Sequence, residues 1–153
     1  MPITISADLF SAAKKSPSFP KDWDDAKVLR ELNRYGKFLT LAQKYPGQPL
    51  APTMDIDHLW HLHMTHPKAY HEDCIRLFGT ILDHDGGFGH DPVELPELKT
   101  TFNRTAELWE QEFGEKYVER EFDPNMTNCW HDCSGRCWHA CKSKHTNSKL
   151  ITI

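Results

Sequence analysis

Apolar side chains recur every three or four positions along much of this chain, which is the spacing of amphipathic helices. One long run covers residues 22–45, and its apolar face consists of Val28, Leu32, Tyr35, Leu39 and Ala42. Another covers residues 96–117, with Leu98, Phe102, Thr105, Leu108, Trp109 and Phe113 at helical spacing. No segment has the alternating pattern of a strand, so the sequence predicts an all-α fold.

Two shorter helices are predicted between these runs, at residues 55–66 and 67–78. Acidic residues favour a helix start at Asp55, because the positive end of the helix dipole attracts negative charge. Pro67 fits the first turn of the second helix, where its missing N–H costs nothing. Gly79 suits a C-terminal cap, since glycine accepts the left-handed conformation that such caps require.

A short amphipathic piece, residues 6–15, precedes the first long helix, and Asp22 is the predicted N-cap of that helix. The chain has 153 residues, the length of one ordinary domain with one hydrophobic core. We therefore predict a compact single-domain helical bundle over residues 1–120. Residues 121–153 form a C-terminal extension of different composition, rich in Cys, Trp and His.

Composition and charge narrow the classes of partner. The chain is 39% hydrophobic and 26% charged, as expected of a soluble globular protein. Its net charge is -4 and its Lys and Arg residues are scattered, which argues against nucleic acid as a partner. No apolar run approaches the roughly 20 residues that cross a bilayer, and the N-terminus lacks a signal-peptide pattern. We therefore expect a cytoplasmic protein without a membrane partner.

Candidate metal-binding side chains are most concentrated in residues 55–74, "DIDHLWHLHMTHPKAYHEDC", which hold five of the ten histidines. This stretch resembles the glycine-rich domain-containing-protein-like family of plants and bacteria. The shared motif falls on Asp57, Trp60, His61, His63, Pro67, Tyr70, Asp73 and Cys74, and a later element falls on Leu108, Trp109 and Phe113. The resemblance covers about residues 25–117 and implies a compact helical domain. In place of the glycine-rich tail of that family, residues 129–141 are rich in Cys, Trp and His.

Helical geometry separates the histidines of this stretch into two faces. Each residue turns a helix by about 100°, so His61 and His63 point about 200° apart. Asp57, His58 and His61 can converge on one face, where two imidazoles and a carboxylate form an open metal site or, alternatively, plain structural hydrogen bonds. His63 shares a face with apolar neighbours, so it is either a further metal ligand or a core histidine bonded to a carboxylate or to backbone.

A further ligand could come from another segment, and the candidates are His84, Asp85, His71 and Asp73. Imidazole and carboxylate donors suit copper, iron or zinc as the cofactor. Trp60 and Tyr70 are expected in the core or in a pocket wall. The lone Cys74 is expected to be a small buried residue.

The tail carries a second candidate site. Four cysteines recur at intervals of four residues, and the candidate ligands there are Cys129, Cys133, Cys137 and Cys141. A continuous helix would spread their sulfurs over about 18 Å, whereas a turn at Ser134–Gly135 would bring the two pairs together. Thiolates favour copper(I), zinc or an iron–sulfur cluster. Two disulfides and an inert tail are the alternatives.

The sequence leaves three functions open. The favoured one is a transition-metal-binding protein with a His/Asp site on a core helix, which as an enzyme would be a metal-dependent oxidoreductase. The second is a protein that handles copper(I) or zinc through its cysteine tail. The third is a helical interaction module without catalysis. Besides the metal ion, the expected partner is a small-molecule or peptide substrate.

If the tail binds metal, Cys133→Ser should remove more bound metal than Cys74→Ser. Cys133 belongs to two pairs of cysteines that lie four residues apart, whereas Cys74 belongs to none. Metal content per chain, measured by mass spectrometry after dialysis, checks this expectation. Equal losses in the two variants would show that the tail pairs do not form the site.

Overall fold

The computed structural model describes residues 2–86 and 91–118, and all regular elements in these ranges are helices. They are α1 (Leu9–Lys15), α2 (Asp25–Lys44), α3 (Met54–Met64), α4 (Pro67–Phe78) and α5 (Leu95–Phe113). The all-α prediction is confirmed. None of these helices is long and apolar enough to cross a bilayer. The four tail cysteines lie outside the described residues.

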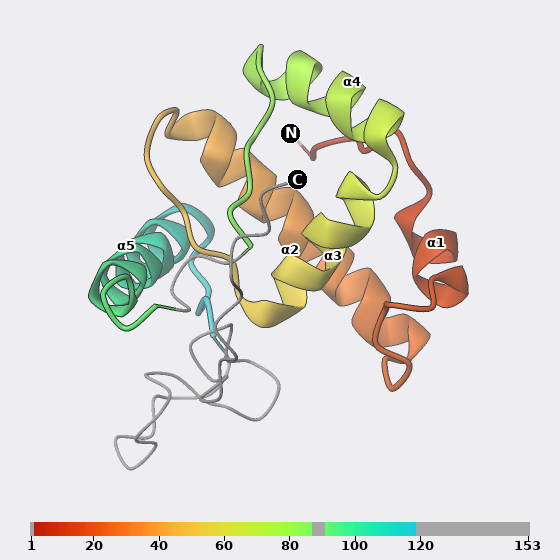
Figure 1. The fold of residues 1–153 in the computed structure, drawn as a ribbon, viewed down its shortest axis with the longest axis horizontal. Coiled ribbons are helices and arrows are strands. Elements are labelled where there is room, and N and C mark those ends of the chain that lie inside the picture. The colour runs from red at the N-terminus through yellow and green to blue at the C-terminus, as the bar shows by residue number, and fades with distance from the viewer. Residues whose placement is uncertain (1, 87–90, 119–153) are drawn as a thin grey trace, which may run out of the picture.

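Helix α3 occupies the centre of the arrangement. It packs against α1, α2 and α4, while α5 packs against α2 (Figure 1). Because α3 has neighbours on several sides, most of its apolar residues are buried, namely Ile56, Leu59, Trp60 and Leu62. A central helix of this kind can carry polar side chains only where they find partners or reach the rim of the bundle.

Side-chain caps set the starts of α2 and α3. Asp24 accepts a hydrogen bond from the backbone N–H of Lys27 at 2.8 Å, so α2 begins at Asp25 and the predicted cap at Asp22 is wrong. Thr53 likewise accepts a bond from the N–H of Ile56 at 3.2 Å, and α3 begins at Met54.

Glycines end two of the helices. Gly79 adopts a left-handed conformation (φ 72°) after α4, as predicted. Gly114 does the same (φ 66°) after α5, so this helix ends before the predicted residue 117. Tyr117 therefore lies beyond the helix, where its fully buried side chain donates a hydrogen bond to the carbonyl of Ala51 at 2.7 Å. The prediction extended the helix to residue 117 because it relied on apolar spacing alone, whereas Gly114 ends the helix.

Helix α5 also holds Ala51, through the backbone N–H of that residue. Its N–H donates to Thr105 Oγ1 at 3.0 Å, and that hydroxyl donates in turn to the carbonyl of Thr101 at 2.7 Å. Both backbone groups of Ala51 are thus bonded in a buried position. These bonds fix the segment that leads into α3.

Replacing Thr105 with valine should lower the free energy of unfolding by about 1–3 kcal/mol, because the buried N–H of Ala51 then lacks an acceptor. Thr100→Val is the matched control, since its hydroxyl makes the same kind of bond, to Pro96 O at 3.0 Å, on the exposed face of α5. The control should change stability by less than about 0.5 kcal/mol. Urea unfolding of both variants measures the difference, and equal losses would contradict the role given to Thr105.

Candidate metal centre

Three side chains converge at the rim of the bundle. Asp57 and His61 lie one turn apart on α3, and His84 comes from the segment between α4 and α5. His84 Nε2 lies 2.8 Å from Asp57 Oδ1 and 2.7 Å from His61 Nε2, and His61 Nε2 lies 3.4 Å from Asp57 Oδ1. Within residues 2–86 and 91–118 this is the group of His and acidic side chains arranged to hold one metal ion.

The position of His84 depends on two aromatic residues. Its ring stacks on Trp60, with centroids 4.0 Å apart and planes 19° from parallel. Trp60 Nε1 donates a hydrogen bond to the Tyr70 hydroxyl at 2.9 Å, and that hydroxyl donates to the carbonyl of Leu82. Burial raises the pKa of the Tyr70 phenol, so it stays protonated and able to donate. Tyr70 therefore ties the segment that carries His84 to α3 and α4.

The cluster is closed on one side and open on the other. The side chain of His84 is 4% exposed and that of Asp57 is 10% exposed, whereas His61 is 48% exposed. Gly86 lies beside both imidazoles, and a Cβ added there would sit 3.5 Å from His61 Nε2 and 3.9 Å from His84 Nε2. The absence of a side chain at Gly86 leaves free space next to the two nitrogen atoms.

His58, a predicted ligand, lies elsewhere. Its ring packs edge-on against Trp23 and Phe19, with centroids 5.9 Å and 6.3 Å away. Burial lowers the pKa of His58 in spite of the opposing charge of Asp57, so the ring is neutral in this contact. Helical spacing placed His58 on the same arc as Asp57 and His61, but the structure brings His84 to that cluster instead.

His63 is in the core, on the side of α3 away from His61. It is 1% exposed, its Nδ1 lies 2.8 Å from the Tyr35 hydroxyl, and its Nε2 lies 3.0 Å from Asp73 Oδ2. A carboxylate only accepts, so Nε2–H donates to Asp73 and Nδ1 accepts from Tyr35. With both nitrogens bonded in this way, His63 matches the core alternative and stands apart from the cluster around Asp57.

The remaining candidate ligands are also accounted for. Burial alone would raise the pKa of Asp73, but hydrogen bonds from Ser6 and Arg76 outweigh it and lower that pKa. Asp73 is thus an ionised partner of buried His63 and of Ser6 and Arg76. His71 is exposed on α4, and Asp85 lines a cavity next to His84.

Fold and site together define a small helical domain with a solvent-open cluster of two histidines and one carboxylate. Residues 3–73 match the family model described as "Glycine-rich domain-containing protein-like". The chain is 32% identical over 120 residues to glycine-rich domain-containing protein 1 of Arabidopsis thaliana. The aligned region covers 72% of this chain and 14% of that protein. It is also 32% identical over 134 residues to glycine-rich domain-containing protein 2 of the same plant, covering 81% of this chain and 17% of the relative.

The chain therefore belongs to the glycine-rich domain-containing protein-like family, as its motif indicated. It spans about a sixth of the length of these curated relatives. No solved structure matches it. The names of these relatives state no activity.

Two parts of the site had no clear signal in the sequence. His84 was one of four candidates for a further ligand, and no spacing rule distinguished it, because it meets Asp57 only through the tertiary fold. Gly86 was not predicted at all. Its position two residues after His84 is a signal that could have drawn attention to it.

Replacing His63 with alanine should lower the free energy of unfolding by about 1–3 kcal/mol, because it leaves Tyr35 and Asp73 buried without their partner. His71→Ala is the matched control, since His71 is an exposed histidine on α4. Unfolding should be measured in chelator, so that bound metal does not add to stability. If both variants unfold at the same urea concentration, His63 does not support the core.

Proposed function

We propose that this protein binds one divalent transition-metal ion through Asp57 Oδ1, His61 Nε2 and His84 Nε2. The observation that carries the proposal is the convergence of these three donor atoms, with separations of 2.7, 2.8 and 3.4 Å. Two imidazoles and one carboxylate are a recurrent donor set of mononuclear sites for iron(II) and zinc.

The separations fit an ion with a small adjustment. Ligand bonds of about 2.0–2.1 Å in a tetrahedral arrangement place donor atoms about 3.3 Å apart. The edge between His61 and Asp57 already has this length at 3.4 Å. The two edges at His84 are shorter, at 2.7 and 2.8 Å, and would open by about half an ångström. Rotation of the half-exposed His61 ring would open its edge with His84. The edge between His84 and Asp57 joins two buried side chains, so it would open through a shift of the segment that carries His84.

The exposure of the cluster favours an open site. Structural zinc sites use four protein ligands, whereas catalytic sites use three and leave a position for water or substrate. Among the described residues this cluster has three donors, its His61 side chain is 48% exposed, and Gly86 leaves space beside the nitrogens. An ion bound by these three donors would keep at least one exchangeable position.

The identity of the ion determines the chemistry that is proposed. Iron or copper would support an oxidoreductase, because both change oxidation state, whereas zinc would act as a Lewis acid. Handling of copper(I) or zinc by the cysteine tail is a separate proposal. It concerns a different donor set and is tested by the cysteine substitutions given above.

The test uses full-length chains in which the tail cysteines are serine, so that the tail cannot contribute thiolates: Cys129, Cys133, Cys137 and Cys141. Zinc, iron(II) and copper(II) are titrated by calorimetry, with iron kept anaerobic. We expect one ion per chain. His61→Ala and His84→Ala should each weaken binding by at least about 100-fold, more than the loss of a group that only orients a ligand.

His58→Ala and His71→Ala are the matched controls, because both lie outside the donor cluster. Both should retain the affinity of the parent chain, and circular dichroism should confirm that all four variants remain helical. The proposal is wrong if the parent chain binds none of the three ions. It is also wrong if His58→Ala loses as much affinity as His61→Ala.

A further inference from the structure

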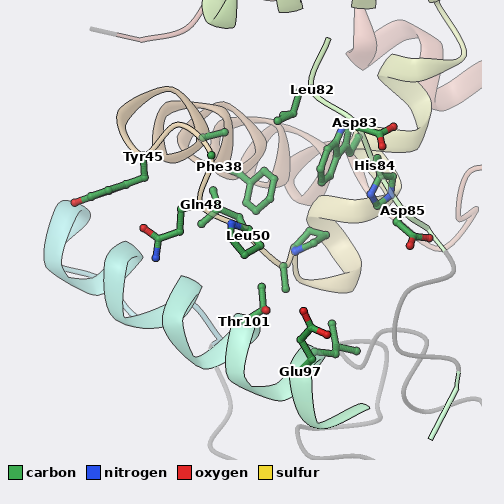
Figure 2. A pocket seen from close by; sticks show the side chains of 17 residues that line it. Phe38, Tyr45, Gln48, Leu50, Leu82, Asp83, His84, Asp85, Glu97 and Thr101 are labelled. Carbon is green, nitrogen blue, oxygen red and sulfur yellow. The ribbon is translucent and has the colours of Figure 1, made fainter. Parts of the chain in front are cut away.

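A cavity of about 530 Å³ lies beside the metal centre. It is bounded by α2, by the segment that precedes α3, by the segment that carries His84, and by α5 (Figure 2). Its body is apolar, with walls formed by Phe38, Leu50, Trp60, Leu82 and Leu98. Sites for small molecules are typically clefts of about 300–1,000 Å³ with mainly apolar linings, so this cavity has the size and surface of a ligand site.

The walls of the cavity are held in place by buried hydrogen bonds. Tyr70 binds the carbonyl of Leu82 on one wall. On another, Thr105 and Tyr117 bind the N–H and the carbonyl of Ala51. A cavity whose walls are fixed in this way is preformed, and a ligand need not spend binding energy on ordering it.

The charged groups of the cavity are all of one sign. Three carboxylates line it, from Asp83, Asp85 and Glu97, and its described lining contains no Lys or Arg. Figure 2 shows Asp83 and Asp85 beside His84, Glu97 apart from them on α5 but nearer to this end, and Tyr45 toward the opposite end. Carboxylates next to low-dielectric walls attract a cation and repel an anion.

We propose that this cavity binds a small organic amine, with its apolar body between Phe38, Leu50 and Leu98 and its protonated amino group at the carboxylate end. The stacked rings of Trp60 and His84 line the cavity, and His84 Nε2 points to Asp57 and His61. The amine would therefore lie next to the proposed ion, with His84 between them. Only this closeness to an ion rests on the proposed function, because the cavity itself needs no ion.

The test compares two probes with the same apolar body and opposite charge, 4-phenylbutylamine and 4-phenylbutyrate. Calorimetry on the full chain at neutral pH should show the amine binding at least about tenfold more tightly, the factor that corresponds to about 1.4 kcal/mol. Glu97→Gln should reduce this preference, because it removes one of the three carboxylates without touching the metal centre.

A pair of variants on α5 locates the binding. Thr101 lines the cavity, whereas the neighbouring Thr100 is exposed and does not. Thr101→Phe should fill the space and abolish binding of the amine, and Thr100→Phe should leave it unchanged. If Thr101→Phe binds the amine as well as Thr100→Phe does, or if the two probes bind equally well, the inference is overturned.

Repeating the titration after chelation separates this inference from the metal site. The amine should bind metal-free protein, because its contacts are the cavity walls and carboxylates. A chain that binds the amine but none of the three ions contradicts the metal proposal alone. A chain that binds an ion but neither probe contradicts the cavity proposal alone.

Discussion

The burial of His63 between Tyr35 and Asp73 fixes the rotation of α3 within the bundle. Both nitrogens of this ring are hydrogen-bonded at a position that is 1% exposed. Turning α3 about its axis would leave these polar groups buried without partners, at a cost of several kcal/mol. Since each residue advances a helix by about 100°, this fixed rotation also places Asp57 and His61 on the opposite rim. The candidate metal centre is thus a consequence of how the core is bonded.

The motif residues of this chain divide into residues that support the core and candidate metal donors. His63 and Asp73 join α3 to α4, and Trp60 with Tyr70 holds the segment that follows α4. The candidate donors, Asp57 and His61, point the other way and meet His84. The histidines of one short stretch therefore lie in two environments, because one helix presents different faces to the core and to solvent.

The sequence predicted those features of the fold that depend on residues close together in the chain. Apolar spacing identified the long helices, the left-handed preference of glycine identified the end of α4, and helical rotation separated His61 from His63. The predicted helix boundaries were wrong where several nearby residues could each have capped or ended the helix. Asp24 caps α2 instead of Asp22, and Gly114 ends α5 before the apolar spacing does. His84 reaches Asp57 because its ring stacks on Trp60 and because Tyr70 holds the carbonyl of Leu82 in the same segment. No spacing along the chain could specify these contacts.

The central claim is that α3 and the segment after α4 share one metal ion. Diffraction from crystals soaked in zinc, recorded on both sides of the zinc absorption edge, tests this claim directly. We predict an anomalous peak about 2.0–2.2 Å from His61 Nε2, His84 Nε2 and an oxygen of Asp57. A peak at other residues, or no peak while His61 and His84 remain in direct contact, would contradict it.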